Sequence, residues 1–352
     1  MSKAKIAVVG TGWWATEAHI PGLLGHPDAE IVALCDADAG RLARAGAHYG
    51  IERIYSDLAT MLNSESLDGL VIATSNASHY ELSLLAITAG LDLLIEKPMT
   101  EQAPHGRELL EAAAHAGTQI VVGHTFHYTN LARRARDLVA AGQVGKIELV
   151  QSLFATGCIS AMDQRETGEG QWVYPVHAPT GQNFSSFGQG QNQVTHSAAL
   201  MAFVVDDGPD CVHAFMSNRE STVDAVDVLT VRFRGGALGA LTSTGLKSGD
   251  EADHHELRIF GSEGYLEMDM ERSASLTLHR FDGHVEELRE EDDAMHYPLR
   301  APVQNFVDVV LGRESNISPA TIAHHSVEIV DAAYRSAALE APVLVADLYG
   351  ES

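Results

Sequence analysis

The chain has 352 residues, a hydrophobic fraction of 45% and a formal net charge of −25. The length predicts two domains, and the negative charge disfavours nucleic acid and anionic membrane surfaces as partners, because both carry charge of the same sign. No apolar run reaches about 18 residues, so no segment is expected to span a membrane.

The first third of the chain alternates short apolar runs with helical patterns. The apolar runs cover residues 5–10, 30–36, 68–75, 92–98 and 118–125, and the helical patterns cover residues 16–25, 39–50, 77–89 and 105–117. Apolar strands separated by helices are typical of βαβ units. Because such crossovers are right-handed, we expect a doubly wound parallel sheet, a Rossmann domain, over residues 1–125.

The pattern changes near residue 125, where we place the domain boundary. Residues 160–190 have weak periodicity and are predicted to form long loops over a site. The remaining predicted strands cover residues 145–154, 226–233, 236–245, 255–261, 264–270 and 275–281, and the helices cover residues 129–142, 301–312 and 319–339. Alternating strands with glycine turns predict a mostly antiparallel sheet with one covered face. Residues 126–352 are therefore expected to form an α+β domain with an open-faced sheet.

The segment GTGWWA, which starts at Gly10, follows a predicted strand and opens a predicted helix. In a dinucleotide-binding loop, Gly10 would permit the tight turn, Gly12 would let the backbone approach the pyrophosphate, and Ala15 would let the helix pack on the strand. Asp36 ends the next strand, where a carboxylate accepts hydrogen bonds from ribose hydroxyls and repels a 2′-phosphate. Since the neighbouring Ala37 offers no cation for that phosphate, the sequence favours NAD over NADP.

Two of the three tryptophans, Trp13 and Trp14, lie in this loop. We expect Trp14 to pack the helix against the sheet or the domain interface. Trp13 directly follows Gly12 and is expected to lie over the crevice, as a wall for the nicotinamide or for a sugar ring. The alternative is that both are buried core aromatics.

The segment IEKP, residues 95–98, places Lys97 at the carboxyl end of a predicted parallel strand. This end faces the crevice where ligands bind in doubly wound sheets. A lysine there can donate to a substrate oxygen, or act as a base if desolvation lowers its pKa. The alternative is a solvated surface pair of Glu96 and Lys97.

The segment GQGQNQVTHSAALMAF begins with amides and ends as an apolar helix. His196 would lie on that helix, with Asn192 one turn earlier on the same face. Gln191 and its neighbouring glutamines supply amide groups suited to binding hydroxyls. The alternative is that His196 is a hydrogen-bonded core residue.

Together these four segments resemble the Gfo/Idh/MocA oxidoreductase family, the relatives of glucose–fructose oxidoreductase and inositol dehydrogenase, over nearly the whole chain. The segment TSNASHYE, residues 74–81, is similar to the family's strand-end segment beside the cofactor. The resemblance implies that Lys97 lies near the reacting hydroxyl and that His196 is the acid/base residue. The cofactor-binding residues expected on these grounds are Gly10, Thr11, Gly12, Trp13, Trp14, Asp36, Arg41, Thr74, Ser75, Asn76, His79, Glu96 and Lys97.

Two departures from the family bear on the substrate. The family often has an aspartate one turn before the histidine and a glycine between them, where this chain has Asn192 and Val194. Asn192 cannot exchange a proton, so a relay would use Lys97, His196 or water. The segment GHTFHYTN lacks the arginine that relatives carry there, which favours a neutral polyol over an anion. The expected substrate-binding residues are Lys97, His124, His127, Trp172, Gln182, Gln191, Asn192 and His196.

The three cysteines, Cys35, Cys158 and Cys211, are widely separated, which predicts neither a disulfide framework nor a zinc motif. The apolar run near the N-terminus is too short for a signal peptide, so we expect a cytoplasmic protein. The histidine doublets at residues 254–255 and 324–325 have no partner at ligand spacing, and no metal site is predicted.

The resemblance therefore implies an NAD-dependent dehydrogenase that oxidises a ring hydroxyl of a small polyhydroxylated substrate, a sugar, glycoside or cyclitol. A homodimer or homotetramer through the second sheet is expected, because one face of that sheet must meet solvent or a partner. Two alternatives stay open: an enzyme that uses NAD in a redox-neutral cycle to cleave a glycoside, and a non-enzymatic NAD-binding regulator. A metal enzyme that uses His124, His127, His177 or His196 is a weaker alternative.

Overall fold

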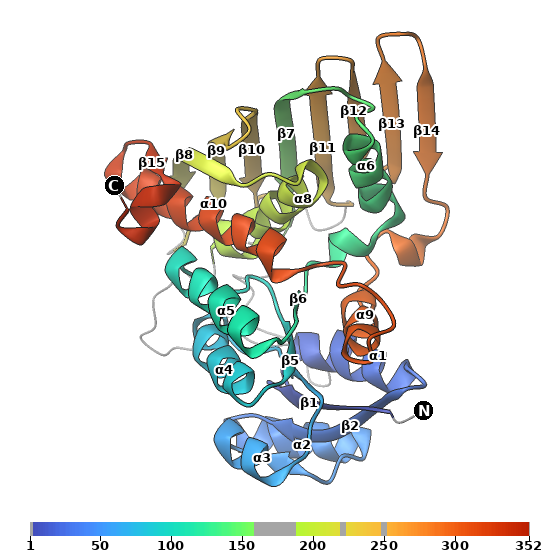
Figure 1. Ribbon diagram of the computed structural model, residues 1–352, viewed down its shortest axis with the longest axis vertical. Helices are drawn as coiled ribbons and strands as arrows, with labels where there is room; N and C mark the ends of the chain where they lie inside the picture. Colours follow the sequence, from blue (N-terminus) through green and yellow to red (C-terminus); the bar gives the residue numbers. More distant parts are fainter. Residues whose placement is uncertain (1–2, 158–187, 219–222, 248–251, 352) are drawn as a thin grey trace.

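The computed structural model describes residues 3–157, 188–218, 223–247 and 252–351, and two sheets organise the chain (Figure 1). The first sheet has six strands in the order β3-β2-β1-β4-β5-β6, and all of its pairings are parallel. Its strands are β1 (Ala4–Val9), β2 (Ala29–Cys35), β3 (Ile54–Tyr55), β4 (Gly69–Ile72), β5 (Asp92–Ile95) and β6 (Ile120–Val122). The strand order reverses beside β1, which creates the crevice where such sheets bind ligands.

Helices connect the strands of this sheet, as the apolar periodicity predicts. They are α1 (Ile20–Gly25), α2 (Ala39–Tyr49), α3 (Leu58–Ser64), α4 (Asn76–Thr88) and α5 (Ala103–Ala116). The predicted helix over residues 16–25 is in fact a π-helical turn, Ala15–His19, followed by α1 with Pro21 in its first turn. Short helix α3 and strand β3 were not predicted, because so few residues show no measurable period.

The second sheet has nine strands in the order β14-β13-β12-β11-β7-β10-β9-β8-β15. Its pairings are antiparallel except for the parallel pair of β7 and β10. The strands are β7 (Ile147–Ala155), β8 (Pro209–Ser217), β9 (Val226–Phe233), β10 (Leu238–Thr244), β11 (His254–Gly261), β12 (Gly264–Asp269), β13 (Ser275–Arg280), β14 (Val285–Arg289) and β15 (Val343–Leu344). The expected fold class, a Rossmann sheet followed by a mostly antiparallel sheet, is confirmed.

Strands β8, β14 and β15 were missed by the sequence analysis. Strand β14 reads VEELR at the edge of the sheet, where charged residues protect exposed backbone from pairing and hide the apolar alternation. Strand β15 has two residues, too few for a pattern.

Helices α6 (Asn130–Ala140), α8 (Thr195–Val205) and α10 (Ala320–Leu339) lie on one face of the second sheet (Figure 1). Helix α8 is buried from Thr195 to Val204, which explains why it is apolar on all sides. The opposite face carries exposed apolar side chains such as Phe215, Val228 and Leu238. Among the described residues, no helix is long and apolar enough to cross a membrane.

The last third of the chain also packs on the first sheet. Helix α9 (Ala301–Val310) lies beside α1 (Figure 1), and its Val303, Phe306 and Val307 share an apolar cluster with β1. A Cβ at Gly69 would lie 2.7 Å from the ring of Phe306, so this contact needs glycine at the start of β4. The two sheets are thus joined by shared packing rather than by a single linker.

Candidate active site

The turn after β1 is shaped for close approach of a ligand to the backbone. Gly10 has φ +87°, and a Cβ there would lie 2.3 Å from the carbonyl oxygen of Ala73. Only glycine fits both the conformation and the space. The next residue, Thr11, is fully buried, and Thr16 in the following turn donates to the carbonyl of Gly12 at 3.1 Å. The loop therefore has the tight backbone cradle that a dinucleotide pyrophosphate requires.

Asp36 lies at the carboxyl end of β2, as predicted, and is 7% exposed. Its carboxylate accepts hydrogen bonds from Thr11 and Asp38 and forms an ion pair with Arg41, whose Nε lies 3.0 Å from Oδ2. Arg41, one of the expected cofactor-binding residues, reaches back from the first turn of α2 to this carboxylate. A cation does stand beside the ribose-reading position.

The two tryptophans differ in burial. Trp13 is 50% exposed, so the alternative that both are core aromatics is wrong. Trp14 is half-buried, and its ring centroid lies 5.4 Å from that of Trp13 and 6.2 Å from that of Tyr297. Tyr297 comes from the segment after the second sheet, so Trp14 packs between the two halves of the chain, as expected.

The segment after β4, residues 74–81, was expected to lie beside the cofactor through Thr74, Ser75, Asn76 and His79. Thr74 and Ser75 do lie at the strand end, where the Ser78 hydroxyl donates to Thr74 Oγ1 at 2.8 Å, and Asn76 begins α4. His79 is fully buried, with Nδ1 2.9 Å from the carbonyl of Pro98 and Nε2 3.2 Å from that of Thr74. Its expected cofactor contact is therefore corrected: His79 ties two strand-end loops together.

Glu96 is buried and does not form a solvated pair with its neighbour. Its Oε1 lies 2.8 Å from Nε2 of the fully buried His19, and its Oε2 accepts from the backbone N–H of Lys97 at 3.1 Å. A Cβ at Gly123 would lie 2.4 Å from Oε1, so the carboxylate is enclosed on this side too. Glu96 thus fixes the backbone of Lys97. His19 was missed, because a lone histidine in a helical pattern carries no positional signal.

Lys97 extends from the end of β5 to the turn that precedes α8. Its Nζ donates to the backbone carbonyl of Asn192 at 2.9 Å. The side-chain amide of Asn192 donates to the carbonyl of Gly188 at 3.2 Å, within the same turn. Asn192 therefore meets Lys97 through its main chain, so the loss of a carboxylate at this position leaves the contact intact.

Three histidines gather beside this contact, and they differ in their partners. His127 is fully buried, with Nδ1 2.9 Å from Ser318 Oγ and Nε2 3.2 Å from the carbonyl of Ala199, and it stacks on Phe203. Burial lowers the pKa of His127 to about 3. The prediction that His127 binds substrate is therefore corrected, since it is a structural histidine.

His124 and His196 are buried but keep open ring nitrogens. Both nitrogens of His124 and Nδ1 of His196 have no hydrogen-bond partner among the described residues. The two ring centroids are 6.2 Å apart. Burial lowers the pKa of each well below its usual value, and the charge of Lys97 lowers that of His196 further. Both imidazoles are therefore neutral, with an acceptor nitrogen each.

Asp224, which no sequence pattern indicated, supports the turn Gly190–Val194, and Asp227 lies beside it. Asp224 accepts from the N–H of Gly190 at 2.6 Å and from the hydroxyl of Tyr334 at 2.8 Å. Asp227 is fully buried, and its two oxygens have no partner in the described part of the chain. Burial, and then the charge of Asp224, raises the pKa of Asp227 to about 8. Gln191, in the same turn, has an unpartnered Oε1 within the described residues.

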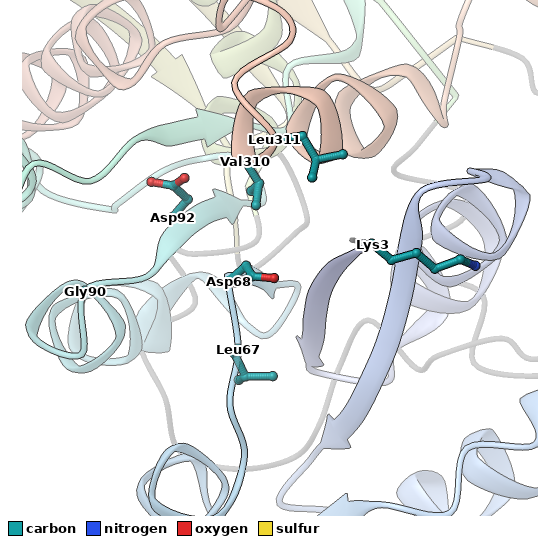
Figure 2. Close-up of a pocket in the computed structure, with 7 residues that line it drawn as sticks. All are labelled: Lys3, Leu67, Asp68, Gly90, Asp92, Val310 and Leu311. Atoms are coloured by element: carbon teal, nitrogen blue, oxygen red, sulfur yellow. The ribbon is translucent and has the colours of Figure 1, made fainter. Parts of the chain in front are cut away.

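Trp172 and Gln182 lie outside the described residues. The described ranges hold no group of three metal-ligating side chains. A pocket of about 440 Å³ lies at the opposite end of the first sheet, near Lys3, Asp68 and Asp92 (Figure 2). Its two carboxylates accept from the backbone N–H groups of Lys5 and Gln119, so they stabilise strand starts.

Comparison with known proteins agrees with this geometry. Residues 4–124 match the model of the oxidoreductase family with an NAD-binding Rossmann fold, and residues 136–345 match the C-terminal alpha/beta domain of the same family. The chain belongs to the Gfo/Idh/MocA oxidoreductase family. The family resemblance is confirmed.

Among curated relatives, D-apiose dehydrogenase of Paraburkholderia graminis is 35% identical over 41% of this chain and 38% of its own length. D-glucoside 3-dehydrogenase of Escherichia coli is 28% identical over 42% of each chain. The matches thus span about two-fifths of these relatives. Among solved structures, an oxidoreductase from Agrobacterium radiobacter, in complex with NAD+, L-tartaric acid and magnesium, has a TM-score of 0.78 and 18% identity. It covers 99% of this chain and 100% of its own, which shows the shared fold.

Proposed function

We propose that the protein is an NAD-dependent dehydrogenase that oxidises a ring hydroxyl of a neutral polyhydroxylated compound, a sugar, glycoside or cyclitol. The observation that carries the proposal is the contact of Lys97 Nζ with the turn that leads into His196. It joins the carboxyl end of β5, beside the dinucleotide cradle at Gly10, to a neutral buried imidazole. The sugar dehydrogenases among the relatives support the substrate class.

Lys97 and His196 divide the work on the hydroxyl. The Lys97 ammonium, held by the Asn192 carbonyl, would donate to the substrate oxygen and keep it in place. Because burial keeps His196 neutral, its ring can accept the hydroxyl proton. Bound NAD would supply the chemistry of accepting a hydride from the carbon that carries this oxygen.

The other open polar groups define where the remaining hydroxyls would bind. His124 contributes two ring nitrogens, and Gln191 contributes an amide oxygen. Buried polar atoms without a partner destabilise a protein, so a ligand that supplies hydrogen bonds to them gains affinity. Neutral donors and acceptors, rather than a cluster of cations, favour an uncharged polyol.

On the cofactor side, the Gly10 turn fits the pyrophosphate and Asp36 lies at the ribose-reading position, which supports NAD over NADP. We also propose a cytoplasmic location, because Cys35 and Cys211 are free thiols. A homodimer or homotetramer through the exposed face of the second sheet would cover Phe215, Val228 and Leu238.

The test is a spectrophotometric screen for reduced nicotinamide. Purified protein would meet hexoses, glycosides, inositols and sugar acids, with NAD and NADP in parallel. We expect a neutral polyol to give turnover with NAD, and Lys97→Ala to lower kcat/KM by about 10²- to 10⁴-fold. Turnover of Lys97→Ala within a few-fold of wild type would contradict the role of Lys97.

If the wild type reduces nicotinamide with none of these compounds, two explanations are possible, and calorimetric measurement of NAD binding distinguishes them. Tight NAD binding without turnover would favour the two alternatives, a redox-neutral enzyme or an NAD-binding regulator. Absence of NAD binding by folded protein would refute the proposal altogether.

A further inference from the structure

The carboxylate of Asp36 already accepts hydrogen bonds from the chain at the positions where ribose hydroxyls would donate. Its Oδ2 accepts from the N–H of Thr11 at 2.7 Å and the hydroxyl of Thr11 at 2.9 Å, and lies 3.0 Å from Arg41 Nε. Its Oδ1 accepts from the N–H of Asp38 at 2.9 Å and from Arg41 Nη2 at 3.1 Å. A carboxylate offers about four lone-pair sites. A ribose hydroxyl could therefore bind Asp36 only after one of these donors has moved.

Arg41 is the donor that can move. The N–H groups of Thr11 and Asp38 belong to the backbone, and the Thr11 side chain is fully buried. The Arg41 side chain is 23% exposed and is attached to the first turn of α2 through a flexible stem. Rotation of Arg41 away from Asp36 would open an acceptor site on Oδ1, because Oδ2 already accepts two hydrogen bonds from Thr11. One open site is enough for the 2′-hydroxyl of a ribose.

The same guanidinium changes the charge that a 2′-phosphate would meet. Asp36 alone would repel a phosphate, and Asp38 lies nearby at the N-cap of α2. Arg41 offsets one of these charges, and a second guanidinium, that of Arg44, lies over the same turn, with Nη1 3.5 Å from the Cβ position of Gly40. Guanidinium groups bind phosphate oxygens through two parallel hydrogen bonds. The local charge is thus balanced rather than negative.

We propose that Arg41 is a specificity-determining residue with two positions, and that it lets the site accept NADP as well as NAD. With NAD, Arg41 leaves Asp36, whose Oδ1 then accepts the ribose 2′-hydroxyl. With NADP, Arg41 binds the 2′-phosphate, and Asp36 keeps its hydrogen bonds to the loop. This inference rests on the proposed dinucleotide function and makes the preference for NAD a small one.

The experiment titrates NADH and NADPH separately into full-length protein by calorimetry, with Arg41→Met as the test variant and Arg133→Met, an exposed arginine of α6, as the control. The readout is the ratio of the two dissociation constants within each variant, so an inactive fraction cancels. In the wild type we expect NADPH to bind within about tenfold of NADH. Arg41→Met should raise the ratio by about 10- to 100-fold through weaker NADPH binding, as loss of a charge-assisted hydrogen bond implies. Arg133→Met, which removes an exposed charge outside this turn, should change it by less than about threefold.

Two results would overturn the inference while leaving the proposed function standing. One is a wild-type ratio above about 100-fold, the discrimination that an unopposed carboxylate gives. The other is a ratio that Arg41→Met leaves unchanged. If the folded wild type binds neither nucleotide, the proposed function fails instead.

Discussion

Two buried polar regions meet at Lys97, and they differ in how their groups are satisfied. On the cofactor side, both oxygens of Asp36 and both oxygens of Glu96 accept hydrogen bonds from the chain itself, although Nδ1 of His19 has no partner among the described residues. On the substrate side, His124, His196 and Asp227 keep nitrogen or oxygen atoms that lack a partner among the described residues. Native proteins pair nearly all buried polar groups, so a cluster of unpaired ones needs a ligand or a proton to complete it.

The difference separates the groups that stabilise the fold, which we call the frame and which include Asp36, Glu96 and His19, from the groups that are available for chemistry. Where a buried group already has its partners, its removal should affect folding. Where it has none, its removal should affect turnover or the pH dependence of stability. Each of the following substitutions tests this division.

The largest effect is expected at His196, on the substrate side. His196→Asn should lower kcat by about 10²- to 10⁴-fold, because the proton acceptor is lost, and should leave NADH affinity nearly unchanged. Since burial and Lys97 lower the pKa of His196, wild-type kcat/KM should stay high below the usual histidine value of 6.5. Steady-state kinetics across pH with the substrate from the screen would measure both. Loss of NADH binding in the variant would show that His196 has a structural role rather than a catalytic one.

On the cofactor side, His19 should behave in the opposite way. His19→Leu removes the Nε2 partner of Glu96 and leaves a buried carboxylate oxygen without it. Breaking such a contact destabilises by about 3–5 kcal/mol, measured as the free energy of unfolding in urea. The matched control is His48→Leu, an exposed histidine of α2, which should change stability by less than about 0.5 kcal/mol. Equal stability of the two variants would show that Glu96 needs no partner.

The histidine pair His124 and His127 gives the sharpest single comparison, because both lie in one short segment. His127→Phe loses two hydrogen bonds and leaves the hydroxyl of Ser318 without its partner, so it should destabilise by about 1–3 kcal/mol. His124→Phe loses no hydrogen bond within the described chain and should change the free energy of unfolding by less than about 1 kcal/mol while raising KM for the polyol. If His124→Phe were less stable than His127→Phe, the division between structural and ligand-binding groups would be wrong.

The sequence predicts the frame better than the substrate side for a physical reason. Gly10, Asp36 and Lys97 follow apolar strands, and the carboxyl ends of parallel strands meet at one edge, so their proximity follows from periodicity. His124 and His127 flank a single 3-10 turn, Thr125–Tyr128, which is too short for a period to show which ring faces the core. The pairing of Arg41 with Asp36 depends on side-chain rotamers, and that of Asp224 with Gly190 depends on how distant segments pack. Neither pairing can be predicted from the local sequence pattern.

The smallest effect is expected at Asp227, where the missing partner is a proton. Burial and the neighbouring carboxylate of Asp224 hold its pKa far above the ordinary 3.8, so the folded state keeps a proton that the unfolded state has lost over this pH range. The free energy of unfolding should therefore fall as pH rises from about 4 to 8 and then level off.

Asp227→Asn removes this dependence and keeps the shape of the side chain. The variant should match the wild type near pH 4 and be more stable at pH 8, because asparagine does not lose a proton as the pH rises. Urea unfolding at several pH values would measure the difference, with Asp210→Asn, an exposed residue of β8 paired with Arg232, as the control. A variant less stable than wild type at pH 8 would mean that Asp227 is ionised and has partners there. Asp227 would then belong with the groups that stabilise the fold.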